Sequence, residues 1–145
     1  MDKAVGNRKK RSSYALYIAW LVSVLATLGS LYFSEIRGYV PCELCWIQRI
    51  FMYPMSIILG IATFFNDRKV IKYVLPLSII GGFVSIFHYM EQKVPGFAEI
   101  KPCTQGVACS SEYINWFGFI TIPFLALLAF SLITIFLFAG RKKNV

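Results

Sequence analysis

Apolar residues occur along this chain in four long runs, separated by short polar stretches. The runs cover about residues 14–33, 46–65, 73–90 and 115–139. Each run is continuously apolar and shows no alternation of apolar and polar positions, which favours helices over the strands of a membrane barrel. A helix rises about 1.5 Å per residue, so about 20 residues cross a hydrocarbon core about 30 Å thick. The pattern predicts an all-α fold, with one membrane domain over residues 1–145 built as a bundle of four helices.

The first run raises the alternative of a cleaved signal peptide, because Arg8, Lys9, Lys10 and Arg11 precede it. The apolar core of a signal peptide usually has about 7–15 residues, which is shorter than this run. The chain also stays apolar long after residue 33. We therefore expect residues 14–33 to form a permanent first helix.

The composition changes the picture in two ways. Apolar residues make up 57% of the 145 residues and charged residues 15%, whereas soluble domains carry about 45–50% and about 25%. A soluble chain this short buries only about two-thirds of its surface, so it could not bury this many apolar residues in a core. We therefore expect the surplus apolar side chains to face lipid. The net charge of +8 would suggest nucleic acid in a soluble protein. Here the basic residues flank the apolar runs, so we expect no nucleic-acid partner.

The positions of the charges predict the orientation in the membrane. Residues 66–69 form a short basic connection, with Lys72 close behind, and both ends of the chain are basic. In a four-span protein these three regions lie on one side, which the positive-inside rule makes cytoplasmic. Residues 34–45 and 91–114 then form two extracytoplasmic loops, and these hold all four cysteines. We expect a multi-pass plasma-membrane protein whose cysteines face an oxidising compartment.

Cys42 and Cys45 stand at the entry to the second run, in the sequence Pro-Cys-Glu-Leu-Cys. If a helix begins near Cys42, steps of about 100° per residue place Cys42, Cys45 and Arg49 on one face about 60° wide. Both thiols then lie at the positive end of the helix dipole, with an arginine one turn below. Both features favour a thiolate, which attacks disulfides or donates electrons. The spacing therefore indicates redox chemistry.

Other interpretations of this first pair stay open. A C-x-x-C pair is also half of a typical zinc site. The pair could instead form a structural disulfide, although closing so short a loop adds little stability. Arg49 could simply extend its guanidinium group to the lipid headgroups.

Cys103 and Cys109 form the second pair, in the longer outer loop with Gly106 between them. A disulfide exposed on such a loop is easy for a partner protein to reach. The alternative is a disulfide that only restrains the loop. A zinc site built from all four cysteines is a poor fit, because such sites usually join two C-x-x-C pairs and an oxidising compartment opposes free thiolates. We expect no metal.

His88 lies about one turn before the outer end of the third run. The second run starts on the outer side and the third ends there, so Arg49 and His88 should lie at similar depth. Ionisable groups at membrane depth are candidates for function, and a ligand with polar carbonyl groups between the helices could bind both. A plain interfacial histidine is the alternative.

Together these features resemble the disulfide-bond formation protein B (DsbB) family. The residues that carry the resemblance are Cys42-x-x-Cys45-x-x-Gln48-Arg49, His88 and the second cysteine pair, within four spans from about residue 14 to residue 139. The short second pair resembles the BdbC branch of Gram-positive bacteria. The resemblance implies an oxidoreductase that reoxidises an extracytoplasmic thioredoxin-fold thiol oxidase of the DsbA or BdbD type. It would pass the electrons to a membrane quinone, menaquinone or ubiquinone, and so support disulfide formation in exported proteins.

The resemblance also implies a role for each cysteine. Cys103 would form the mixed disulfide with the partner, and Cys109 would attack the other pair. Cys42 and Cys45 would take the electrons next, with Cys45 against the quinone ring.

The resemblance places Arg49, His88 and Gln48 at the quinone. Gln48 stands where proteobacterial members often carry an acid. The outer loop is shorter than theirs, without room for a separate interfacial helix between its cysteines.

Three other functions compete with this one. Enzymes of the vitamin K epoxide reductase type also combine four helices, a quinone and C-x-x-C, but there the motif opens the last helix. A structural or accessory membrane protein with two stapling disulfides would need no partner oxidase. A metal-binding membrane protein would use the cysteines as ligands.

Overall fold

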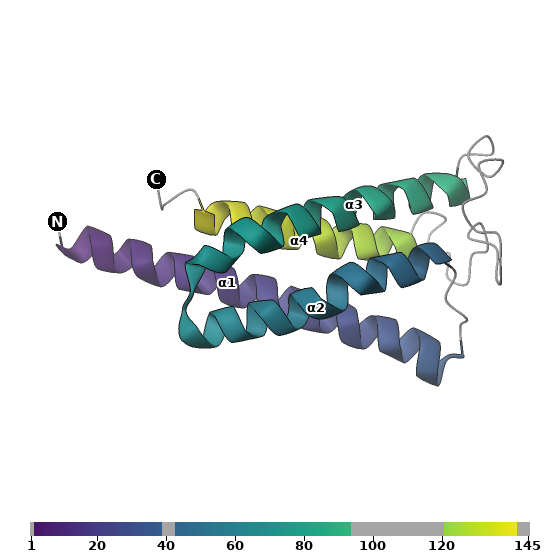
Figure 1. Ribbon diagram of the computed structural model, residues 1–145, viewed down its shortest axis with the longest axis horizontal. Helices are drawn as coiled ribbons and strands as arrows, with labels where there is room; N and C mark the ends of the chain where they lie inside the picture. The colour runs from purple at the N-terminus through teal and green to yellow at the C-terminus, as the bar shows by residue number, and fades with distance from the viewer. Residues whose placement is uncertain (1, 39–42, 94–120, 142–145) are drawn as a thin grey trace.

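A computed structural model describes residues 2–38, 43–93 and 121–141 of the chain (Figure 1). Its elements are α1 (Asp2–Leu31), a π-helical turn η1 (Tyr32–Ile36), α2 (Glu43–Phe65), a 3-10 turn η2 (Arg68–Val70), α3 (Ile71–Lys93) and α4 (Ile122–Arg141). Within these residues, four helices are long and apolar enough to cross a membrane. These observations confirm the predicted all-α membrane fold, and the described ranges contain no strand.

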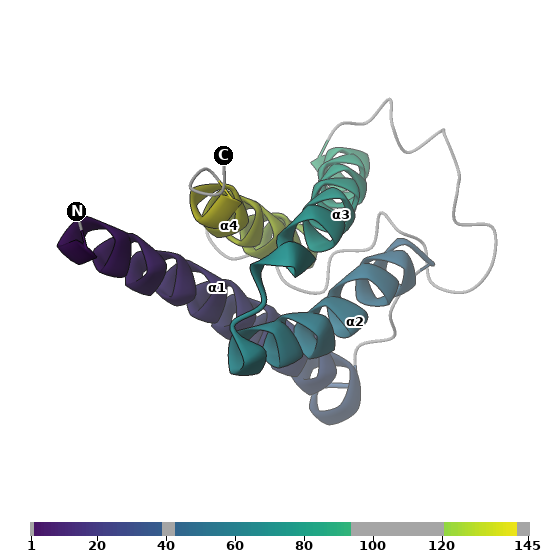
Figure 2. The same cartoon turned by 60° about the vertical axis from the view of Figure 1, so that its left-hand side comes forward.

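The four helices pack as a closed ring of neighbours. α1 lies beside α2 and α4, and α3 lies beside the same two helices (Figures 1 and 2). α1 begins and α4 ends at the end of the bundle that holds the connection between α2 and α3 (Figure 1). At the opposite end, α1 and α3 finish and α2 and α4 begin. We call this opposite end the α2/α4-start end. Cys42, Cys103 and Cys109 fall outside the described residues.

The observed helices differ in their bounds from the predicted apolar runs. α1 begins at Asp2 and so includes the basic residues before the first run. α2 and α3 contain the predicted second and third runs and extend past them, α2 at its start and α3 at both ends. α4 begins at Ile122, and residues 115–120 of the predicted fourth run lie outside the described residues. Which face of the membrane each end occupies stays a prediction.

The connection between α2 and α3 is a tight turn made by the local sequence. Asn66 adopts a left-handed conformation with φ of 52°, and asparagine tolerates this conformation better than most residues. The N–H of Asp67 donates to the Ala62 carbonyl at 2.9 Å, as in a Schellman ending. The Asp67 carboxylate accepts from the Lys69 N–H at 2.9 Å and so starts η2. These contacts turn the chain back within a few residues.

Burial in this bundle follows the pattern expected of a protein surrounded by lipid. Large apolar side chains are exposed on the outer faces, such as Leu25 at 68% and Phe64 at 84%. Several polar side chains are buried, among them Ser23, Ser85 and His88. In lipid the apolar surface needs no burial, whereas polar groups must find partners inside the protein.

Hydroxyl groups link neighbouring helices at two levels. The Thr27 hydroxyl of α1 lies 2.8 Å from the Ser56 hydroxyl of α2, and one of the two donates to the other. The Ser23 carbonyl lies 2.8 and 3.0 Å from these hydroxyls and accepts the remaining hydrogen. On the other side of the bundle, the Ser78 hydroxyl of α3 donates to the Phe130 carbonyl of α4 at 3.1 Å. Small hydroxyl residues let helices approach closely and replace the water that lipid excludes. These contacts fix the register of α1 against α2 and of α3 against α4.

We expect the contact between Thr27 and Ser56 to contribute to stability as a coupled pair. A double-mutant cycle of Thr27→Val and Ser56→Ala should give a coupling energy of about 0.6 kcal/mol, the average for such bonds in membrane helices. Reversible unfolding in mixed micelles measures it. Thr63→Val paired with Ser56→Ala is the matched control, because the Thr63 hydroxyl bonds within its own helix. If the two substitutions lowered the free energy of unfolding additively, with no coupling energy, the contact between Thr27 and Ser56 would be contradicted.

Candidate functional site

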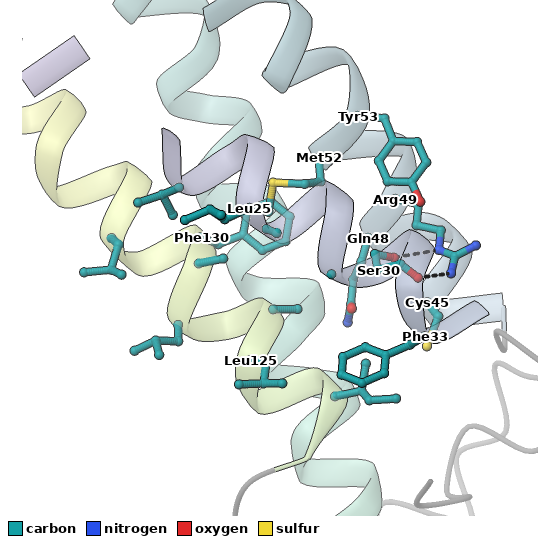
Figure 3. A pocket seen from close by; sticks show the side chains of 18 of the residues that line it. Leu25, Ser30, Phe33, Cys45, Gln48, Arg49, Met52, Tyr53, Leu125 and Phe130 are labelled. Carbon is teal, nitrogen blue, oxygen red and sulfur yellow. Dashed lines mark hydrogen bonds between the residues drawn. The ribbon is translucent and has the colours of Figure 1, made fainter. Parts of the chain in front are cut away.

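A cavity of about 410 Å³ lies between α1, α2 and α4 (Figure 3). Sites for small ligands usually have about 300–1,000 Å³. Its walls are mostly apolar, with polar groups from α1 and α2. The lining residues are Val22, Leu25, Ala26, Gly29, Ser30, Phe33, Ser34, Cys45, Gln48, Arg49, Met52, Tyr53, Ile122, Leu125, Ala126, Leu128, Ala129, Phe130 and Leu132.

The polar side chains of the cavity gather toward one of its ends. Cys45, Gln48 and Arg49 come from the first two turns of α2, and Ser30 from the last turn of α1. Met52 lies two turns further along α2, about 10 Å from Cys45 at about 1.5 Å per residue. The cavity therefore has a polar end near the α2/α4-start end of the bundle and an apolar end deeper in the membrane span.

The cavity also opens sideways to the surroundings of the bundle. Leu25 of α1 and Leu128 of α4 both line it, and their side chains are 68% and 48% exposed. Since the outer faces of α1 and α4 carry exposed apolar side chains, this opening faces the hydrocarbon region of a membrane. An apolar molecule dissolved in the membrane can enter there without crossing water.

Cys45 is the third residue of α2 and half-buried at the polar end of the cavity. Glu43 begins the helix, and an acidic residue is favourable at this position because of the helix dipole. The neighbouring Leu44 is buried and packs against Val84 and Phe87 of α3, which fixes the first turn of α2. A thiol in the first turn of a helix is placed where the positive end of the dipole favours its thiolate.

Arg49 is held by α1 one turn below Cys45. Its Nε donates to the Ser30 hydroxyl at 3.0 Å, and its Nη2 donates to the Ser30 carbonyl at 3.1 Å (Figure 3). The Trp46 ring lies 5.3 Å from the guanidinium carbon, within the range of a cation–π contact. The two bonds to Ser30 use two of the five N–H groups of the guanidinium. The other N–H groups of the guanidinium can donate to an anionic or carbonyl group at the polar end of the cavity.

Ser30 stands two residues before the rare turn η1, which covers Tyr32–Ile36. A π-helical turn changes the direction of the side chains that follow it, and such turns often lie at functional sites. Here the residues at this turn include Phe33 and Ser34, both of which line the cavity. The turn therefore shapes the polar end from the side of α1.

Gln48 and His88 form a buried pair between α2 and α3. Their side chains are 6% and 1% exposed, and Gln48 Nε2 lies 3.2 Å from His88 Nδ1. With the amide nitrogen facing it, Nδ1 accepts the hydrogen bond, and a neutral His88 ring carries its proton on Nε2. Gln48 lines the cavity, whereas His88 is absent from the lining described above. His88 therefore lies behind Gln48 and can affect the cavity through it.

The structure brings together three of the residues singled out from the sequence. Cys45, Gln48 and Arg49 line one cavity, and His88 contacts Gln48. Direct contact of His88 with a ligand stays a prediction, as do the roles of Cys42, Cys103 and Cys109. Within the described ranges no three histidine, cysteine or acidic side chains gather as metal ligands would.

Sequence reasoning missed Ser30, Tyr53 and Phe130 in the cavity wall. The hydroxyl of Tyr53 is buried and has no hydrogen-bond partner among the described residues. Its signal was present in the sequence, because Tyr53 follows Arg49 by four residues and so shares its helix face. Ser30 and Phe130 depend on how α1 and α4 align with α2, for which a single sequence carries no local signal.

Residues 11–140 match the family model described as "Disulfide bond formation protein DsbB". "Disulfide bond formation protein C" of Bacillus subtilis (strain 168) is 70% identical over 89% of this chain and 95% of its own length. "Probable disulfide formation protein C 1" of Bacillus anthracis is 52% identical over 94% and 99%. "Probable disulfide formation protein" of Coxiella burnetii (strain CbuK_Q154) is 48% identical over 86% of both chains. No solved structure matches the chain significantly.

The pairing of Gln48 with His88 predicts the tautomer of the single histidine in the chain. We expect ¹⁵N NMR of histidine-labelled protein to show Nε2 protonated and Nδ1 accepting. Gln48→Glu replaces the donating amide by a carboxylate, which only accepts, so the proton should move to Nδ1. Ser34→Ala, at another cavity residue, should leave the histidine spectrum unchanged. A Gln48→Glu spectrum identical to that of the wild type would show that the two side chains do not interact.

Proposed function

The chain belongs to the DsbB family of disulfide bond formation proteins, and from this premise we propose that it oxidises a partner thiol protein and delivers the electrons to a membrane quinone. Family membership and the four spans make it a multi-pass membrane protein of disulfide formation, with the role of a disulfide oxidoreductase. Its similarity to the Bacillus relatives fits the BdbC-like branch. The quinone and the partner oxidase are the parts that we propose.

One observation carries the proposal. The Cys45 thiol and the Arg49 guanidinium share the polar end of a cavity that is otherwise apolar and opens toward the membrane interior. A membrane quinone has the matching chemistry, with carbonyl oxygens on its ring and a long apolar tail. The polar end suits the ring, and the apolar end and side opening suit the tail.

The donor groups of the cavity fit the oxygens of a quinone. Arg49 retains N–H groups beyond those that bind Ser30. The buried Tyr53 hydroxyl, without a partner in the described part of the chain, can donate to an oxygen that enters the cavity. A buried hydroxyl without a partner costs about 1–3 kcal/mol, so a ligand that accepts its hydrogen bond removes this cost. Gln48 adds a further amide at the polar end.

A bound quinone supplies an acceptor for two electrons and two protons. On the protein side, the thiols of Cys42 and Cys45 lose two electrons and two protons as one sulfur–sulfur bond forms between them. Arg49 stabilises the Cys45 thiolate before this step and the negative charge that develops on the acceptor during it, as a preorganised electrostatic group. Ser30 holds the guanidinium in position throughout. The apolar walls exclude water and so strengthen these interactions.

The second half of the proposal concerns the partner protein. An extracytoplasmic thioredoxin-fold oxidase, reduced by its substrates, would exchange with the Cys103–Cys109 disulfide. In the order implied by the family, Cys103 forms the mixed disulfide and Cys109 then attacks the Cys42–Cys45 disulfide. Each exchange needs an attacking thiolate and a reachable disulfide. The basis for this order is family membership, since three of these cysteines lie outside the described residues.

The decisive experiment mixes the purified protein with a reduced thioredoxin-fold oxidase and a quinone. We expect the quinone absorbance to fall as the oxidase forms its disulfide, in equal molar amounts. Cys45→Ser should abolish the reaction while leaving the protein folded, because serine cannot form the disulfide. Wild-type protein that consumes no menaquinone and no ubiquinone would defeat the proposal and favour a structural role for the disulfides.

Arg49 should matter far more for turnover than for assembly. Removing one preorganised donor at a developing negative charge typically lowers kcat about 100- to 1,000-fold, and we expect this range for Arg49→Ala. Arg49→Lys keeps the charge but loses the paired bonds to Ser30, so it should recover part of kcat. Arg11→Ala, an exposed site near the start of α1, is the control for a general loss of positive charge. Parallel losses of kcat and of folded protein would remove Arg49 from the mechanism.

A further inference from the structure

Gly81 of α3 lies against the ring of Phe130 of α4. A Cβ atom built on Gly81 would be 2.4 Å from Cε1 and 2.5 Å from Cζ of that ring. Real Cβ atoms do not approach other atoms so closely, so the ring edge occupies a notch that a glycine alone provides. Phe130 is 1% exposed, and it also lines the cavity (Figure 3). The same ring therefore touches α3 on one side and the cavity on the other.

The side chain of Phe130 can move more easily than its backbone. The Phe130 carbonyl accepts hydrogen bonds from the hydroxyls of Ser78 and Thr134, which ties this stretch of α4 to α3. The clashing atoms are at the far end of the side chain. The space beside the ring is the cavity. A methyl group on Gly81 would therefore displace the ring toward the cavity and leave the packing of the helices largely intact.

Phe130 lies toward the apolar end of the cavity. It follows Ile122, which begins α4 at the α2/α4-start end, by eight residues, or about 12 Å of helix. If the quinone ring reacts at Cys45, the part of the molecule that approaches Phe130 is its apolar tail. We propose that Gly81 determines how much of the cavity is available to the prenyl tail of the quinone, because the edge of the Phe130 ring packs against this glycine. Gly81 itself does not line the cavity. This inference rests on the proposed function.

Gly82 provides a matched control on the same helix. A Cβ on Gly82 would meet Cβ of Phe130 at 3.8 Å, an ordinary contact. Gly81→Ala and Gly82→Ala make the same chemical change and raise helix propensity equally. A difference between them in quinone binding therefore reports on the Phe130 ring.

The test measures equilibrium binding to the fully oxidised protein, which cannot reduce the quinone. Two probes are used, a ubiquinone with one isoprene unit and the same ring without a tail. Gly81→Ala should raise Kd for the prenylated probe about tenfold, or about 1.4 kcal/mol, and change Kd for the tail-less probe less than twofold. Gly82→Ala should change neither. Phe130→Leu added to Gly81→Ala should restore binding of the prenylated probe, because the smaller side chain vacates the space.

Each result is decisive in one direction. The inference would be overturned if Gly81→Ala raised Kd equally for both probes. It would also be overturned if Gly81→Ala and Gly82→Ala changed Kd to the same extent. Failure of Phe130→Leu to rescue a folded Gly81→Ala protein would overturn it as well. If Gly81→Ala does not fold, Phe130→Trp replaces it, since the larger ring exceeds the same notch and should also weaken binding of the prenylated probe alone. Wild-type protein that binds neither probe and reduces no quinone would refute the proposed function instead.

Discussion

The tie between Arg49 and Ser30 is the constraint on which the candidate site depends. A guanidinium group within a membrane span is costly unless it is paired or reaches water. Here α1 offers it both a hydroxyl and a carbonyl from one residue. These bonds place α1 and the start of α2 side by side and aim the charge at one end of the cavity. Cys45, one turn before Arg49 on the same helix, is then placed beside a cation whose position does not depend on a ligand.

The cavity itself results from a contrast between close and loose packing. Hydroxyl contacts at Thr27 and Ser56 bring α1 and α2 together below the site, and Gly81 lets α3 and α4 approach around the Phe130 ring. Between α1 and α4 the lining residues Gly29, Ala126 and Ala129 have side chains too small to fill the space. Small residues thus act in two ways, closing one helix interface and leaving a hollow at another.

The sequence predicted those features that depend on one helix at a time. Four spans follow from the length of the apolar runs, and the shared face of Cys45 and Arg49 follows from their spacing along α2. The contact of Gln48 with His88 was not foreseen, although both residues were candidates, because it depends on the rotation of α2 against α3. Ser30 and Phe130 were missed for the same reason. The η1 turn adds a local change of helical geometry that apolar periodicity does not reveal.

The amide at position 48 has an electrostatic consequence for the site. Gln48 is 6% exposed, and an ionised acid at this depth would need a paired charge to offset its desolvation. Gln48 faces the His88 ring of α3, whereas the adjacent Arg49 is held by Ser30 of α1, so the guanidinium would not be the direct partner of an acid at position 48. The cavity lining contains no acidic side chain, so none of the residues that line the cavity offsets the positive charge of Arg49. An anionic thiolate at Cys45, or negative charge developing on a bound acceptor, is then stabilised by Arg49 within the cavity.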